Sequence, residues 1–123
     1  QISIEKLNKP KDINYLAEGD FTLTEIKANK MPIGKFHKDE ILFTSYEIQL
    51  IEGDVIYTFS DGYADQFGGE KGKKFMKKNF KDLLIVVAKF PINKQKEKLK
   101  EAFNEWLSDY DQVDDVCVMG VEV

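Results

Sequence analysis

The amino-acid sequence predicts one domain of the α+β class. The chain has 123 residues, of which 42% are hydrophobic and 12% are aromatic. This length suits about one domain, and this apolar content supports a buried core. Strand-like segments occur before residue 60 and at the C-terminus, and two segments between them carry apolar residues at helical spacing. Strands followed by consecutive helices and a closing strand are typical of α+β domains.

The N-terminal part contains two predicted strands separated by a turn. Residues 1–7 alternate apolar and polar side chains, which favours a short strand. Residues 18–20 have the sequence of a turn, and the β-rich stretch 21–27 follows them. Residues 31–34 are predicted to be a loop, because Pro32 lacks the backbone donor that a strand needs.

A β-hairpin is the clearest prediction for the middle of the chain. Residues 46–50 alternate apolar and polar side chains, and residues 51–54 are expected to form the turn. Residues 55–59 are almost continuously apolar, as in an interior strand that is covered on both faces. A flexible glycine-rich loop is expected from Ser60 to Gly72.

Two helices and a buried strand complete the expected fold. Apolar residues recur at helical spacing over 76–87 and, more strongly, over 99–110. Asn93, shortly after Pro91, is the predicted N-cap of the second helix. The continuous apolar run at 116–121 predicts a second buried strand.

Charge and cysteine content argue against several classes of function. The 18 basic and 22 acidic residues give a net charge of −4, which disfavours binding to nucleic acid or to an anionic membrane surface. The single cysteine, Cys117, excludes an internal disulfide and fits a reducing, cytoplasmic location. Its apolar surroundings predict a buried, unreactive thiol. The chain has no arginine, so that anion binding relies on lysine, backbone amides or a metal ion.

Acidic residues at the ends of two predicted strands are the strongest functional signal. Asp61 follows one strand, and Asp114 and Asp115 precede the last one. If these strands are neighbours, Asp61 and Asp114 converge. Carboxylate oxygens are the ligands that Mg²⁺ and Mn²⁺ prefer. On spacing alone the alternative is an ordinary Asp-Gly turn and an ordinary strand edge.

Three segments of the chain form a recognisable series. In chain order they are EIKANKMPIG at 25–34, GDVIYTFSDGYADQFGG at 53–69 and QVDDVCVMGV at 112–121. Together they resemble the SpoIIE-type phosphatases, which are bacterial members of the metal-dependent (PPM, protein phosphatase 2C-like) serine/threonine phosphatases. The resemblance implies an antiparallel β-sandwich flanked by helices, with a two-metal centre. Residues 1–123 would be the C-terminal portion of one such domain, without the N-terminal half that carries the family's first metal aspartate.

The resemblance also implies which residues carry the chemistry. Asp61 and Asp114 would bind Mn²⁺ or Mg²⁺, and Asp115 and Gly62 would lie beside them. Asp65 would be either a third, outer ligand or a turn residue. Water activated by the metal would attack the phosphorus of phosphoserine or phosphothreonine directly, with no catalytic residue beyond the metal ligands. The substrate would be a phosphorylated bacterial signalling regulator, such as an antagonist of an anti-sigma factor.

Other residues give weaker signals. Lys71, Lys73 and Lys74 form either a solvated surface or a basic patch that draws an acidic phosphoprotein toward the site. His37 is expected to be a surface residue. A missing half of the sandwich would expose sheet edges, which predicts a homodimer. Without the family's first metal aspartate, the isolated chain is expected to have little or no phosphatase activity. The alternative function is a non-catalytic α+β interaction module that retains a remnant of the fold.

Overall fold

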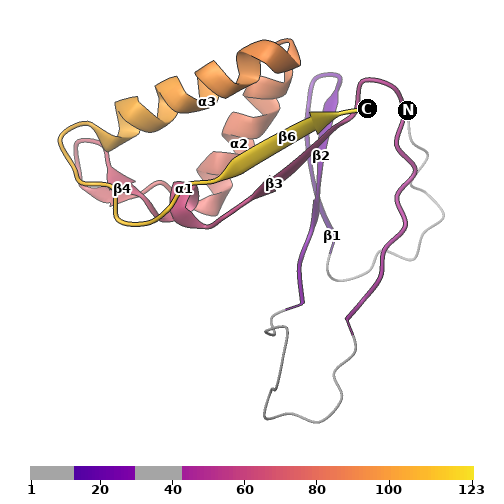
Figure 1. The fold of residues 1–123 in the computed structure, drawn as a ribbon, viewed down its shortest axis with the longest axis horizontal. Coiled ribbons are helices and arrows are strands. Elements are labelled where there is room, and N and C mark those ends of the chain that lie inside the picture. The colour runs from indigo at the N-terminus through magenta and orange to yellow at the C-terminus, as the bar shows by residue number, and fades with distance from the viewer. Residues whose placement is uncertain (1–12, 30–42) are drawn as a thin grey trace, which may run out of the picture. The chain divides into compact units, whose positions relative to one another are not determined.

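The computed structural model describes residues 13–29 and 43–123, which fall into two units, Gln1–Gln49 and Leu50–Val123. In the first unit, β1 (Ile13–Glu18) and β2 (Phe21–Ile26) form an antiparallel hairpin (Figure 1). Its turn contains Gly19, which has a φ of +60°. The predicted turn at 18–20 and the following strand are confirmed, whereas β1 was not predicted.

Some sequence predictions fall on other parts of the chain. The predicted strand at 1–7, the loop at 31–34 and His37 lie outside the described residues. None of the helices in 13–29 and 43–123 is long and apolar enough to cross a membrane.

The second unit contains the two helices and the remaining strands. Two strands from opposite ends of this unit pair with each other, and α2 and α3 follow one another between them in the chain (Figure 1). Its elements are β3 (Val55–Phe59), α1 (Gly62–Asp65), β4 (Phe67–Gly68), β5 (Lys73–Lys74), α2 (Lys77–Ala88), α3 (Ile92–Leu107) and β6 (Val118–Glu122).

The partner of β3 is β6. The two strands are antiparallel, with Val55 opposite Glu122 and Phe59 opposite Val118. The predicted hairpin between 46–50 and 55–59 is therefore wrong, because residues 46–50 form no strand. Alternation in a sequence indicates which side chains share a face, and it does not identify the pairing partner.

The β3–β6 pair is more exposed than the sequence predicts. Ile56 is 43% exposed, Phe59 42% and Val121 51%, so β3 is not covered on both faces and β6 is not a buried strand. Cys117 precedes β6 and is exposed and free, which corrects the prediction of a buried thiol. A continuous apolar run shows that a segment can be buried, but it does not supply the layer that would cover it.

The core of the second unit is a cluster of aromatic rings between α1, α2 and α3. The Tyr63 ring lies 4.6 Å from that of Phe80 and 5.0 Å from that of Phe103 between centroids, and Phe59 of β3 lies 4.8 Å from Phe80. Such edge and tilted contacts stabilise a core beyond the area that they bury. The buried apolar residues are Tyr63, Ala64, Phe80, Leu84, Ile85, Val87, Leu99 and Phe103.

Helix α3 starts and ends differently from the prediction. It begins at Ile92 with Pro91 as its N-cap, and the Pro91 carbonyl accepts a hydrogen bond from the Lys94 N–H at 2.8 Å. The predicted Asn93 cap is therefore wrong, because proline already fixes an extended backbone at the residue before the helix. The helix ends at Leu107, and Tyr110 lies beyond it and is 43% exposed.

Met76, the residue before α2, has a strained backbone. Its φ is +77°, and its side chain is 57% exposed. Its N–H donates to the Ala64 carbonyl at 2.7 Å, and its own carbonyl accepts from the Phe80 N–H at 3.1 Å. A residue with a side chain costs about 1–3 kcal/mol in such a conformation, whereas glycine adopts it freely.

We expect Met76→Gly to raise the free energy of unfolding by about 1 kcal/mol, because the substitution relieves this strain and removes only an exposed side chain. Chemical denaturation measures the change. The control is Lys77→Gly, one residue further along, which is expected to lower stability by about 1 kcal/mol because its backbone is already helical. Equal losses in the two variants would contradict the prediction.

Candidate functional site

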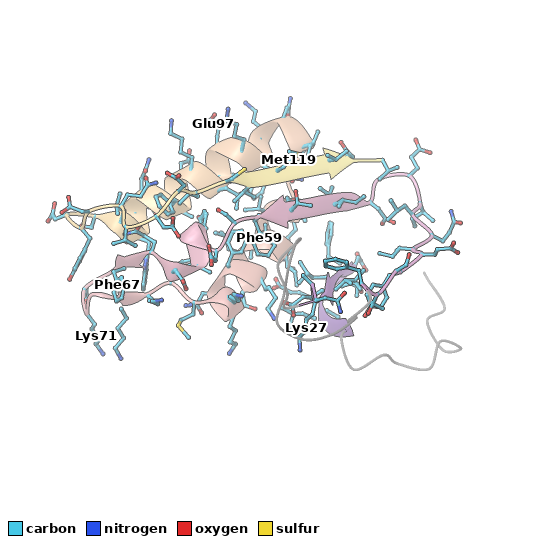
Figure 2. The ribbon with its side chains drawn as sticks, turned by 60° about the horizontal axis from the view of Figure 1, so that its bottom comes forward. Lys27, Phe59, Phe67, Lys71, Glu97 and Met119 are labelled. Atoms are coloured by element: carbon cyan, nitrogen blue, oxygen red, sulfur yellow. The ribbon has the colours of Figure 1, made fainter. Side chains whose placement is uncertain are left out.

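The pairing of β3 with β6 brings two acidic segments to one edge of the sheet. Asp61 follows β3, and Asp114 and Asp115 precede β6. Because the strands are antiparallel, the end of β3 lies beside the start of β6. Figure 2 shows the side chains along these strands, with Phe59 labelled on β3 and Met119 on β6. The sequence predicted that Asp61 and Asp114 would converge if their two strands were neighbours, and β3 and β6 are neighbours.

Ser60 ties the two segments together. Its Oγ donates to the Asp115 carbonyl at 2.9 Å and accepts from the Cys117 N–H at 3.0 Å. Its backbone N–H donates to the Cys117 carbonyl at 3.0 Å. Ser60, the residue before Asp61, thus forms hydrogen bonds with Asp115 and Cys117, the two neighbours of Val116. These bonds fix the separation of the two segments. This role of Ser60 was not predicted from the sequence, although Ser60 belongs to the Ser-Asp-Gly segment.

Gly62 allows the two segments to approach each other closely. A Cβ atom at Gly62 would lie 2.3 Å from the Asp115 carbonyl oxygen, a distance at which two such atoms overlap. Gly62 is buried and begins α1. The structure therefore places Gly62 directly against the backbone of Asp115.

The acidic side chains at this edge face solvent. Asp61, Asp114 and Asp115 are all exposed. The Asp114 carboxylate accepts from the Asp115 N–H at 2.7 Å, and the Asp114 carbonyl accepts from the side-chain amide of Gln112 at 2.8 Å. Residues 112–115 line an open depression of about 310 Å³. The carboxylates are accessible to an ion or a ligand from bulk water.

The donor set at this edge suits part of a metal site. Carboxylate oxygens are the ligands expected for Mg²⁺ or Mn²⁺. Within residues 13–29 and 43–123, however, no group of three or more histidine, cysteine or acidic residues is arranged to hold a metal ion. The carboxylates of Asp61 and Asp114 have the donor chemistry that such an ion prefers, and two carboxylates alone would supply only some of the ligands that it needs.

Asp65 has a partner of its own. It is the last residue of α1, and its carboxylate lies 3.3 Å from the Lys74 ammonium, with both side chains 43% exposed. The Lys74 ammonium also lies 5.8 Å from the centroid of the Phe67 ring. The sequence left two roles open for Asp65, outer ligand or turn residue, and this ion pair gives its carboxylate a partner within the hairpin that follows α1.

The segment predicted as a flexible glycine-rich loop is an ordered, packed structure. It consists of α1 and the short β4–β5 hairpin. The Gly69 N–H donates to the Trp106 carbonyl at 2.8 Å, and a Cβ at Gly68 would lie 1.9 Å from the same oxygen. These glycines are required for contact with the end of α3, which the sequence did not reveal.

The lysines of this region are on the surface. Lys71 lies in the turn of the β4–β5 hairpin, and Lys73 and Lys74 form β5; all three are exposed. Figure 2 shows Lys71 at the end of the hairpin, with Phe67 on the neighbouring strand. The side chains are available to a partner, and Lys74 is shared with Asp65.

Two tyrosines behind this edge serve as hydrogen-bond donors. Tyr63 of α1 is 2% exposed and donates to the Leu99 carbonyl at 2.8 Å, while Tyr57 of β3 donates to the Gln95 side chain of α3. Burial raises the pKa of both hydroxyls above the ordinary 10.0. They therefore stay protonated at neutral pH and hold β3 and α1 against α3.

Gln66, like Ser60, is a residue near the site that was not predicted from the sequence. It lies between α1 and β4 and is 0% exposed, and its side-chain amide contacts the segment that leads to Asp114. The only signal in the sequence was its position directly after Asp65 within the 53–69 segment. A buried amide has no periodicity that would distinguish it from a surface glutamine.

Comparisons with known proteins agree with this architecture. The family model for stage II sporulation protein E (SpoIIE) matches residues 13–123. The solved structure of the SiaA-PP2C domain of Pseudomonas aeruginosa is similar, with a TM-score of 0.71 and 26% sequence identity over 83% of this chain and 39% of that chain. This chain thus spans well under half the length of that domain. No match was found among curated proteins.

The match covers most of the chain and includes β3, α1 and β6, whose pairing forms the acidic edge. The α+β class and the protein phosphatase 2C-like fold are confirmed by the similar structure. The chain belongs to the SpoIIE family of phosphatase domains.

Proposed function

We propose that the chain is part of a metal-dependent serine/threonine protein phosphatase of the SpoIIE type. Membership in the family indicates a phosphatase domain in general. The observation that carries the finer proposal is the junction of β3 and β6, where Ser60 and Gly62 contact the backbone of Asp115. This contact brings the Ser-Asp-Gly segment and the Asp-Asp segment to a common edge, as a shared site requires.

In this proposal Asp61 and Asp114 are ligands of Mn²⁺ or Mg²⁺, and Asp115 lies beside them. A divalent cation at this edge would neutralise charge on a phosphate group and lower the pKa of bound water. The chain's own contribution is to hold carboxylates at fixed strand ends. Ser60 and Gly62 set the approach of the two segments, and the exposure of the acidic side chains leaves room for a phosphoryl group.

The test is calorimetry of Mn²⁺ binding to the 123-residue chain. We expect weak but measurable binding that is lost in Asp61→Asn and in Asp114→Asn, because each substitution removes a charged oxygen ligand and keeps the side chain's size. The control is Asp109→Asn, an exposed aspartate in the turn after α3, which is expected to leave binding unchanged. If none of the substitutions affects Mn²⁺ binding, or if there is no binding, the non-catalytic interaction module is favoured instead.

The isolated chain is expected to lack phosphatase activity. Its described residues contain no complete group of metal-binding side chains. We therefore expect no Mn²⁺-dependent hydrolysis of p-nitrophenyl phosphate by residues 1–123, measured by the absorbance of the released nitrophenolate. Metal-dependent turnover that disappears in Asp61→Asn would show that the chain holds a sufficient site by itself.

The proposed substrate is an acidic phosphoprotein, such as a phosphorylated antagonist of an anti-sigma factor in the cytoplasm. Lys71, Lys73 and Lys74 are exposed on the hairpin that follows α1, and lysine is the only strong base in the chain. A cluster of like charge next to a site raises the local concentration of an oppositely charged ligand.

The formation of a homodimer through exposed sheet edges stays a prediction.

Charge reversal tests this basic patch. The probe is a synthetic peptide with one phosphoserine flanked by glutamates, and binding is followed by shifts of the backbone amide resonances. We expect Lys71→Glu/Lys73→Glu to weaken binding several-fold at low salt, and added salt to weaken the wild type similarly. The control is Lys94→Glu/Lys96→Glu, which makes the same charge change at exposed positions of α3. Equal weakening by both pairs would mean that only net charge matters.

A further inference from the structure

The side-chain amide of Gln66 uses both of its N–H donors and its carbonyl oxygen in hydrogen bonds within the protein. Its Nε2 donates to the carbonyls of Phe67 and Asp111, both at 2.9 Å. Its Oε1 accepts from the Val113 N–H at 3.3 Å. The residue is 0% exposed, so these protein groups, and not water, satisfy the amide.

The backbone of Gln66 anchors the same residue to two further elements. Its carbonyl accepts from the indole N–H of Trp106 at 3.1 Å and from the Phe75 N–H at 2.9 Å. Trp106 belongs to α3, and Phe75 follows β5. The backbone of Gln66, and with it the start of its side chain, is therefore held by Trp106 and Phe75 and not by the loop between α3 and β6 that the side-chain amide contacts.

The loop between α3 and β6 is held at two places. Gln66 binds residues 111 and 113, and Ser60 binds residues 115 and 117. The side chains of residues 111–115 are exposed, so apolar packing contributes little to the position of this segment. Asp114 lies between the two anchors. Both anchors flank α1, whose residues Tyr63 and Ala64 are buried in the core.

We propose that the buried amide of Gln66 is a positioning group that holds Asp114 at the same strand edge as Asp61. The inference rests on the proposed function, because it assigns Gln66 a role at the proposed metal-binding edge. The role requires a side chain that donates and accepts at once. Glutamate cannot donate to the Asp111 carbonyl, methionine does neither, and asparagine is one methylene shorter.

The chain offers a matched control for this role. Gln95 is a second buried glutamine, 4% exposed, whose amide donates to the Phe90 carbonyl at 2.8 Å and accepts from Tyr57. It lies in α3 and makes no contact of this kind with residues 111–115. Gln95→Glu therefore introduces the same buried charge without removing an anchor of the Asp114 loop.

The experiment uses the ¹⁵N-labelled 123-residue chain with two readouts. Hydrogen exchange of the Val113 amide reports the anchor itself, and broadening of amide signals by added Mn²⁺ reports which residues lie near the ion. In Gln66→Glu we expect Val113 to exchange about tenfold faster. We expect broadening to persist at Asp61 and to weaken at Asp114, with metal affinity falling about 10–100-fold. Gln95→Glu is expected to change neither readout.

Unchanged exchange of Val113 and unchanged broadening at Asp114 in a folded Gln66→Glu chain would overturn the proposal. If Gln66→Glu does not fold, Gln66→Met keeps the side chain's length without a charge and is measured in the same way. In the wild type, the side-chain amide protons of Gln66 are also expected to exchange more slowly than those of the exposed Gln112; equal rates would refute the anchor. Absence of Mn²⁺ broadening in the wild type would refute the proposed metal site, while the exchange comparison still decides the role of Gln66.

Discussion

Gly62→Ala is expected to lower the free energy of unfolding by about 3 kcal/mol and to move Asp115 away from Ser60. The added Cβ would lie 2.3 Å from the carbonyl oxygen and 2.9 Å from the carbonyl carbon of Asp115. The obstacle is a backbone carbonyl group that accepts a hydrogen bond from the Ser60 hydroxyl, so it cannot rotate away as a flexible side chain does. One of the segments has to shift.

The sign of this effect separates it from ordinary helix propensity. Gly62 lies in α1 and outside the positive-φ region, so its backbone conformation suits alanine. An alanine in a helix is normally about 1 kcal/mol more favourable than glycine. A stabilised Gly62→Ala protein would therefore show that the contact with Asp115 is not made in solution.

Chemical denaturation gives the stability change, and amide spectra locate the displacement. We expect the resonances of residues 115–117 to move, because Ser60 bonds to this stretch. The control is Gly53→Ala, where φ is +89° and nothing lies within 4 Å of the added Cβ. That variant is expected to lose about 1 kcal/mol through backbone strain alone and to leave residues 115–117 in place.

Phe80→Ala is expected to lower the free energy of unfolding by about 3–5 kcal/mol. Phe80 is 0% exposed, and its ring contacts those of Phe59 and Tyr63. Truncation leaves a cavity at the point where β3, α1 and α2 meet. A loss of this size is a large part of the total stability of a small domain, which is about 5–15 kcal/mol.

Thermal and chemical denaturation measure this loss. The control is Phe90→Ala, in the same unit, where the ring is 40% exposed and lies near the Lys98 ammonium. Phe90→Ala is expected to lose less than half as much, because much of its surface already contacts water. If the two variants lose equal stability, the aromatic cluster is not the core of this unit.

Local patterns in the sequence predicted the elements that depend on near neighbours. The turn at 18–20, the strand β2 and the helices α2 and α3 follow from turn residues and apolar periodicity, which act within a few residues. Such patterns did not predict β1, whose sequence has no clear alternation and which forms by pairing with β2. They also did not predict the ordered structure of residues 60–72, because the glycines there contact Trp106 of a distant helix.

In the candidate site, too, the features that depend on near neighbours were predicted and those that depend on distant contacts were not. The sequence placed Asp61 and Asp114 at strand ends, and the resemblance of its three segments identified the family that the comparisons confirm. Their roles as metal ligands stay predictions. The buried Gln66, the anchoring hydroxyl of Ser60 and the ion pair of Asp65 with Lys74 were not predicted, because each depends on a partner that is remote in the chain or on burial.

The sequence by itself determined the class of the fold, its main helices and the positions of the acidic residues at the ends of β3 and β6. Only the tertiary structure decided that β3 pairs with β6, that Cys117 is exposed and that Gln66 binds the Asp114 loop. The physical reason is that periodicity records which face of a segment is apolar. Periodicity does not record which other segment covers this face or pairs with a strand. That choice depends on the free energy of the whole folded chain.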